Sequence, residues 1–147
     1  LFPYTTLFRS TPFTKENTQS VSESGLTNDN SIVCKMTYGQ FSMMFTGDAQ
    51  KEVEEKILKD YKPADLKADV LKVGHHGSKT SSSDAFVKAI APKAATISCA
   101  AGNQYKFPHE PTLKTLQKYN VEVYRTDRNG VITITTDGSS YSIEKEH

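Results

Sequence analysis

Apolar residues along the chain follow two different periods, and the change from one to the other predicts strands that alternate with helices. Over residues 32–38 apolar positions alternate with polar or small ones, Gly39-Gln40 interrupts the pattern, and apolar residues resume over 41–46. A two-residue period is typical of a β-strand. We therefore predict a hairpin here, with one of its strands buried on both faces.

The rest of the chain continues this alternation. Val53, Ile57 and Leu58 are spaced as on one face of a helix, which predicts a helix over 49–60. Alternating strands and helices indicate an α/β fold, a mixed sheet with helices packed on it. The later elements are predicted as a buried strand over 69–73, a short helix over 85–91 ended by Pro92, a strand over 94–99, a helix over 112–119 opened by Pro111, a strand over 121–125, and a hairpin of 131–136 and 139–144 around Asp137-Gly138.

Composition excludes few functions. Lys and Arg number 18 and Asp and Glu 17, so the net charge of +1 gives no global preference for nucleic acid or for a membrane surface. No apolar run approaches the ~18 residues of a membrane span. The cysteines, Cys34 and Cys99, both lie in apolar runs, which favours buried free thiols over a disulfide.

The stretch with the most chemistry runs from Asp69 to Ser83. A short apolar run ends at Gly74, and two imidazoles, a second glycine, a lysine and several hydroxyl side chains follow. Residues at the ends of buried strands are held by a rigid backbone, and glycines let a ligand approach closely. His75 and His76 can offer neutral nitrogens to a metal or a proton to a substrate.

Two further polar groups stand at predicted strand ends, namely Asp48 and His109. One carboxylate with several imidazoles is the ligand set of a zinc-type site. The same residues have structural explanations, because Asp48 precedes a helix that it can cap and the histidines can be buried core residues. Spacing alone leaves both interpretations open.

The order of the motifs resembles the C-terminal half of ComEC-type metallo-β-lactamase-fold hydrolases, from about Asn28 to about Ile134. The long Gly-His-His-Gly-Ser-Lys-Thr-Ser-Ser string is its most specific part. The resemblance implies part of an αβ/βα sandwich with one or two metal ions at the sheet edge. It rests on residues 31–38, Phe-x-x-x-x-Thr-Gly-Asp at 41–48, the stretch 69–82, Phe-Pro-His-Glu-Pro at 107–111, and Val-Tyr-Arg-Thr-Asp at 123–127 with Asn129-Gly130.

The resemblance also implies roles for site residues. Asp48 matches the family's bridging aspartate, and we expect His75 rather than His76 to bind the metal, with His76 contacting substrate or donating a proton. His109 is expected as a last ligand. Zinc is the expected ion, with manganese as the alternative. Many relatives have a second histidine where this chain has Phe107, so the role of that loop is left open.

Phosphodiesters are the substrate class that we expect, single-stranded DNA among them. A bound metal lowers the pKa of its water toward ~7, which allows hydroxide to attack at neutral pH. Gly77, Ser78, Lys79 and Thr80 can receive phosphate oxygens, Lys79 as a point charge and the loop as a small anion nest. The structural alternative is that residues 78–83 cap the next helix, with Ser83 at the cap, and that Lys79 is a solvated charge.

The domain organisation is expected to be that of a fragment. Residues 1–10 resemble the translation of a widely used DNA-sequencing adapter, and residues 11–29 are a polar loop or the stump of a longer domain. Residues 30–147 would then be the C-terminal half of the hydrolase domain. The family's first metal motif, a His-x-His-x-Asp-His-like cluster, is absent from the chain, so we expect the fragment to be inactive without the N-terminal half. In the parent protein a membrane channel domain is a further expected partner.

Two other functions remain open at this stage. The chain can be a binding module that keeps the fold and lacks the metal, or a hydrolase of carboxylic esters or lactones. Fold-level analogy does not separate these from a phosphodiesterase.

Overall fold

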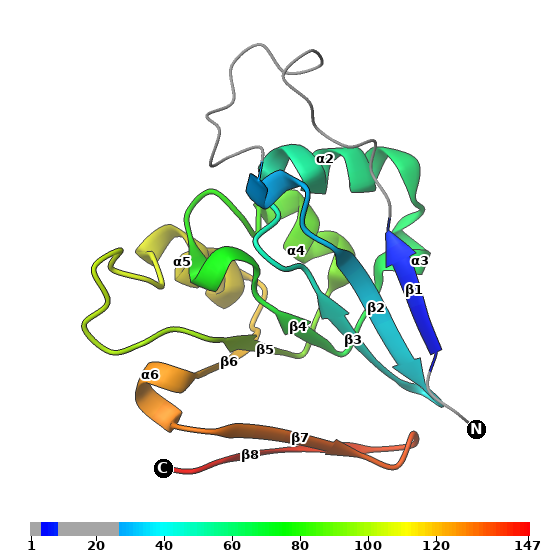
Figure 1. Cartoon of the computed structure of the whole chain (residues 1–147). Helices are drawn as coiled ribbons and strands as arrows, with labels where there is room; N and C mark the ends of the chain where they lie inside the picture. Colours follow the sequence, from blue (N-terminus) through cyan, green and yellow to red (C-terminus); the bar gives the residue numbers. More distant parts are fainter. Residues whose placement is uncertain (1–3, 9–26) are drawn as a thin grey trace.

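A computed structural model describes residues 4–8 and 27–147 and forms a six-stranded mixed sheet with helices packed on it (Figure 1). The strands lie in sequence order across the sheet. The first strand pairs antiparallel with the second, and the second with the third. The third to sixth strands are parallel to one another. The strands are β1 (Tyr4–Phe8), β2 (Val33–Tyr38), β3 (Phe41–Phe45), β4 (Val70–Lys72), β5 (Ala94–Ile97) and β6 (Glu122–Arg125).

Each face of the sheet is covered by a different layer (Figure 1). Met44, Leu71 and Ala95 pack with the helices, whereas their neighbours in the strands, Met43, Val70 and Ala94, pack with a separate hairpin. The central strands are apolar at both alternating positions because both faces are buried. The helices are α2 (Lys51–Asp60), α3 (Pro63–Leu66), α4 (Asp84–Ile90) and α5 (Glu110–Lys118), and the hairpin consists of β7 (Ile132–Thr136) and β8 (Tyr141–Lys145).

The parallel strands direct the candidate chemistry to one edge of the sheet. The carboxyl ends of β3, β4 and β5 lie side by side, and each is followed by a loop. Residues 46–50 follow β3, the 3₁₀ turn η1 (Gly74–Gly77) follows β4, and residues 98–109 follow β5. Ligand sites of α/β sheets form at this edge.

The predicted α/β class is confirmed, and so are the strands and longer helices, with ends shifted by a few residues. Helix α2 starts at Lys51 with Gln50 at its N-cap. The cap interpretation of Asp48 is therefore wrong, because Asp48 lies outside the helix. The short helices α3 and α6 (Thr126–Asn129) were not predicted; both are only one turn long.

The ends of the chain differ from expectation in one respect. Residues 4–8, part of the adapter-like stretch, form the edge strand β1 and pair with β2. Residues 11–26 of the predicted loop or stump lie outside the described residues. Both cysteines are free, as expected, but each is only partly buried. Within the described part of the chain, no helix combines the length and the hydropathy needed to cross a membrane.

Candidate functional site

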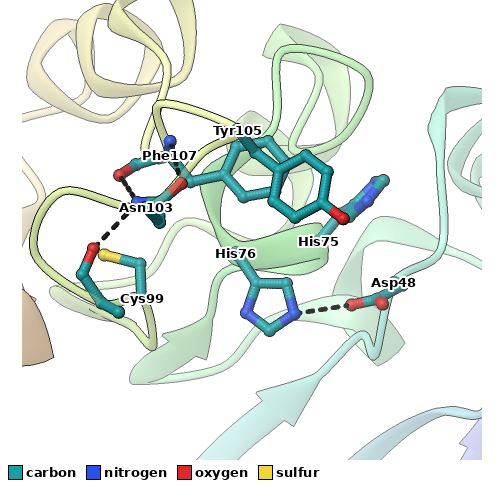
Figure 2. A pocket seen from close by; sticks show the side chains of 8 residues that line it. Asp48, His75, His76, Cys99, Asn103, Tyr105 and Phe107 are labelled. Atoms are coloured by element: carbon teal, nitrogen blue, oxygen red, sulfur yellow. Dashed lines mark hydrogen bonds and ion pairs between the residues drawn. The ribbon is translucent and has the colours of Figure 1, made fainter.

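A cavity of about 420 Å³ opens at the carboxyl ends of β3, β4 and β5 (Figure 2). The loops after these strands supply all of its walls. Three of the lining side chains are those that the sequence singled out, Asp48, His75 and His76. The remaining lining residues are Cys99, Ala100, Asn103, Tyr105 and Phe107.

Asp48 and His76 point toward one another across this cavity (Figure 2). His76 Nε2 lies 3.7 Å from Asp48 Oδ1, and the two side chains are 47% and 41% exposed. Backbone hydrogen bonds fix both loops: the Asp48 N–H donates to Ser31 Oγ (3.1 Å), and the His75 N–H donates to the Gly47 carbonyl (3.0 Å). The loop after β3 therefore holds the turn after β4.

The tautomer of His76 follows from its second nitrogen. His76 Nδ1 lies 2.7 Å from the Ser98 carbonyl oxygen, which only accepts hydrogen bonds, so Nδ1 must carry a proton. In the neutral ring Nε2 is then a bare acceptor facing a carboxylate. Two acceptors in this position repel one another unless a cation or a proton lies between them. A carbonyl that orients a histidine through its other nitrogen is a usual accompaniment of metal-ligating histidines.

The backbone under the two histidines is in an uncommon conformation. His75 has φ 47° and His76 has φ 55°, both in the left-handed region. For residues other than glycine this conformation costs roughly 1–2 kcal/mol each, and such strain concentrates at functional sites. His75 lies in the same cavity with its ring 5.5 Å from that of Phe107, and its Nδ1 is 3.5 Å from Thr80 Oγ1.

His109, the third expected histidine ligand, is bonded elsewhere. The Lys79 N–H donates to His109 Nδ1 (3.0 Å), so the ring proton sits on Nε2, which donates to the Tyr105 carbonyl (3.2 Å). Neither nitrogen is open to a metal in this arrangement. The structure thus brings Asp48 together with His75 and His76. The His109 ring is instead hydrogen-bonded to the backbone at Lys79 and at Tyr105.

The expected phosphate-binding residues lie beside the cavity and make hydrogen bonds within their own loop and to His109. The Ser78 N–H donates to the His75 carbonyl (2.8 Å), and the Thr80 N–H donates to Ser78 Oγ (3.3 Å). The Gly77 carbonyl accepts from the His109 N–H (2.9 Å). Lys79 lines a second cavity of about 400 Å³, between α2 and α5, rather than the cavity of Asp48.

A buried carboxylate that the sequence analysis did not single out holds this loop. Glu54 of α2 is 2% exposed and accepts from the backbone N–H groups of Ser82 (2.5 Å) and Ser83 (2.8 Å). Burial raises the pKa of Glu54, and the hydrogen bonds partly oppose that shift. Ser83 occupies the N-cap position of α4 as predicted, although its side chain makes no capping bond to the helix. The sequence signal that could have identified Glu54 is its position within the apolar helix face that includes Val53 and Ile57.

Lys72 is the second residue that the sequence analysis left without a role. It ends β4 directly before the η1 turn, and its Nζ donates to the Val73 carbonyl (3.0 Å). Burial lowers the pKa of Lys72, while the nearby charge of Asp48 acts in the opposite direction. The available signal was a lysine inside an otherwise apolar buried strand.

The fit of a divalent metal to these residues can be tested from the donors present. Adjacent ligands of a tetrahedral zinc ion lie roughly 3.4 Å apart, and the facing atoms of Asp48 and His76 are 3.7 Å apart. The pair therefore fits two positions of one ion. Over residues 4–8 and 27–147, no cluster of three or more His, Cys, Asp or Glu side chains has the arrangement of a complete metal site.

Comparison with known proteins relates the chain to short segments of longer bacterial proteins. It is 44% identical over 105 residues to ComE operon protein 3 of Bacillus subtilis, covering 71% of this chain and 13% of that protein. It is 36% identical over 107 residues to Recombination protein 2 of Haemophilus influenzae, covering 73% of this chain and 13% of that protein. It is 34% identical over 105 residues to Competence protein ComA of Neisseria gonorrhoeae, covering 71% of this chain and 15% of that protein.

No protein-family model matches the chain. The chain spans about one seventh of the length of these curated relatives or less. The expected relationship to competence proteins is confirmed at this level: the chain is homologous to a segment of ComEC- and Rec2-related proteins.

Proposed function

We propose that this chain supplies one wall of a metal-dependent site that hydrolyses phosphodiesters, within a competence-related protein of the metallo-β-lactamase fold. The observation that carries the proposal is the pair of facing acceptors, Asp48 Oδ1 and His76 Nε2, 3.7 Å apart in a cavity at the ends of parallel strands. Such a pair is stabilised by a cation.

The two histidines exchange the roles that the sequence suggested. His76 faces Asp48 and is oriented by the Ser98 carbonyl, so we assign it as the metal ligand together with Asp48. His75 lines the same cavity and is assigned to proton transfer or substrate contact. Zinc, or manganese in its place, would supply a bound water with a pKa near ~7 and would polarise the phosphoryl oxygen.

The chain's own residues then hold and orient the reacting groups. The Ser98 carbonyl holds the Nδ1 proton of His76, so that in the neutral ring Nε2 offers its lone pair to the cavity. The ring of Phe107 is stacked on that of His76, with centroids 6.1 Å apart.

DNA is the phosphodiester that we propose as substrate, because homologues of the chain are named for competence. The metal-binding residues that the described chain lacks would come from other parts of a parent protein, of which the relatives' segments are a small share. A membrane channel domain of that parent is a proposed partner. One observation favours a second candidate, a metal-free binding module: the described residues do not themselves complete a metal site.

Metal binding tests the proposal directly. Equilibrium dialysis of the chain against Zn²⁺ and Mn²⁺ should show binding that Asp48→Ala and His76→Ala each weaken by about 100-fold, since each removes a direct ligand. Asp65→Ala, an exposed aspartate on α3, is the matched control and should bind as the wild type does. Equal affinity in all four proteins would favour the metal-free module.

Activity is measured in parallel on a fluorogenic phosphodiester and on single-stranded DNA. The chain and the product of the gene's full coding region are compared with and without Zn²⁺. We expect turnover by the full product that His76→Ala abolishes, and little turnover by the chain alone. Hydrolysis that His76→Ala leaves unchanged would contradict the assignment.

A further inference from the structure

Three rings form a column from the candidate metal pair to the surface (Figure 2). The Phe107 ring lies on His76 with centroids 6.1 Å apart and planes 20° apart, and the Tyr105 ring lies on Phe107 at 5.5 Å and 20°. These are the distances and angles of stacked aromatic pairs. Tyr105 is 62% exposed, so the column ends in solvent. We refer to Tyr105, Phe107 and His76 as the aromatic column.

The outer part of the column is fixed by hydrogen bonds rather than by burial. Asn103 closes the loop: its Nδ2 donates to the carbonyls of Ala100 (2.9 Å) and Phe107 (2.8 Å), and its Oδ1 accepts from the Phe107 N–H (2.9 Å). His109 Nε2 donates to the Tyr105 carbonyl (3.2 Å). An exposed tyrosine on a loop held in this way keeps its position without core packing, and a preorganised ring loses little entropy when a ligand stacks on it.

We propose that Tyr105 and Phe107 form a stacking platform for a nucleobase of a single-stranded nucleic acid, and that this base places the adjacent phosphodiester at the Asp48–His76 pair. The inference rests on the proposed function for the choice of ligand. Every base has a flat π face, so such a platform binds with little sequence preference, and base–aromatic stacking contributes about 1–3 kcal/mol per base.

The position of the platform favours this occupant over an apolar peptide or a small phosphodiester. The column leads from the solvent to the facing side chains of Asp48 and His76, so a stacked group lies next to the proposed position of the reacting bond. Lys106, between the two ring-bearing residues, is exposed and can meet a backbone phosphate. Paired bases are stacked on each other and do not present a free face, so duplex DNA should not use the platform.

The test measures binding without metal, so that no cleavage occurs. Fluorescence anisotropy in EDTA and low salt compares a labelled ten-nucleotide oligothymidylate with an abasic oligomer of equal length, which has the same phosphates and no bases. The wild-type chain should bind the oligothymidylate at least fivefold more tightly than the abasic oligomer. Equal affinity for the two, or no binding of either, would overturn the proposal.

Variants then locate the contact. Tyr105→Leu should weaken oligothymidylate binding at least fivefold and leave abasic binding unchanged, while Tyr105→Phe keeps wild-type affinity. Tyr4→Leu is the matched control, because Tyr4 is 60% exposed and lies on β1. Phe107→Leu is the second variant and should lose affinity in the same way. An equal loss of affinity for both oligomers would assign the effect to charge. A loss of oligothymidylate affinity in Tyr4→Leu as large as that in Tyr105→Leu would assign it to a general defect. Either result would overturn the proposal.

The outcome is separable from that of the proposed function. Discrimination between the two oligomers together with absent metal binding would retain the platform and reject the hydrolase. Metal binding together with equal affinity for the two oligomers would retain the hydrolase and reject the platform.

Discussion

Two neighbouring sets of polar groups at the same sheet edge differ in where their hydrogen bonds go. In the loop of residues 78–83 the polar groups are bonded within the chain: Glu54 accepts from two backbone N–H groups, Thr112 Oγ1 donates to the Ser78 carbonyl (2.9 Å), and Ser81 Oγ donates to the Gly74 carbonyl (2.8 Å). In the cavity, His76 Nε2 and Asp48 Oδ1 face one another at 3.7 Å, a separation too long for a hydrogen bond, and they form an ion pair only when His76 is protonated. We refer to the first set as the clamped loop and to the second as the acceptor pair.

The difference separates structural from functional polar residues better than residue type does. Both regions contain serine, threonine, histidine or carboxylate side chains that suggest chemistry in a sequence. A group whose hydrogen bonds are satisfied within the fold contributes to stability, and its loss exposes unpaired buried partners. A partly exposed group that faces a like acceptor costs stability in the absence of a ligand, which is the trade that binding sites make.

The clamped loop should therefore respond to mutation with a loss of stability. Glu54→Ala leaves two buried N–H donors without an acceptor and should lower the free energy of unfolding by about 3 kcal/mol. Glu54→Gln keeps one acceptor and should cost about 1 kcal/mol. Urea unfolding followed by circular dichroism measures both. A loss below 1 kcal/mol in Glu54→Ala would show that the clamp is not structural.

An ion pair behind the cavity tests the pH dependence of stability. Arg125 Nη2 lies 2.6 Å from Asp127 Oδ2, both side chains are largely buried, and the hydrogen bond from Arg125 holds the pKa of Asp127 below its ordinary 3.8. The unfolded chain thus takes up the proton at a higher pH than the folded one. The stability from this pair is present above about pH 4 and is lost as the pH falls through the folded-state pKa.

Asp127→Asn should cost about 2 kcal/mol at pH 7, because it removes a charge-assisted hydrogen bond. Its stability should also fall less steeply than that of the wild type when the pH drops from 5 to 3. Thermal unfolding over this range is the measurement. An unchanged slope in Asp127→Asn would mean that other carboxylates dominate acid unfolding.

His109 lies between the two regions and sharpens the comparison. Since both of its nitrogens are bonded, His109→Gln should lower stability by about 1 kcal/mol and leave zinc affinity within twofold. The same variant should weaken oligothymidylate binding slightly, because the Tyr105 carbonyl loses its donor. A tenfold loss of zinc affinity would restore the metal-ligand role expected from the sequence.

The smallest effect is expected for Lys79. Its side chain lines the second cavity, so Lys79→Ala should change phosphodiester hydrolysis and oligonucleotide binding by no more than about twofold, the value of one solvated charge. Lys51→Ala in the same cavity is the matched control. A loss of tenfold in Lys79→Ala alone would support the phosphate contact inferred from the sequence.

The sequence was sufficient for the α/β class and for most strands and the longer helices. Period-two and helical spacing identified the main strands and helices, because burial on one or both faces fixes those patterns. Asp48 and the histidine pair were placed at strand ends by the sequence pattern and in one site by the family resemblance, and the structure brings them into one cavity.

The orientations within the site were beyond the reach of pattern. Two consecutive left-handed residues, at His75 and His76, decide which ring faces Asp48, and no sequence signal requires that conformation in histidine. The direction of Lys79 depends on how its loop is clamped by Glu54, a contact between residues far apart in the chain. Tertiary contacts of this kind leave no periodic trace in a sequence.

One measurement tests the central claim most directly. A long-range ¹H–¹⁵N correlation spectrum of the histidine rings reports the protonation of each ring nitrogen, and it can be followed during a Zn²⁺ titration of the chain. We expect the metal-free protein to show His76 protonated at Nδ1, and Zn²⁺ to shift the His76 Nε2 resonance while those of His109 remain unchanged. Zinc-dependent shifts at His109 with none at His76 would contradict the assignment of Asp48 and His76 as the acceptor pair that binds the metal.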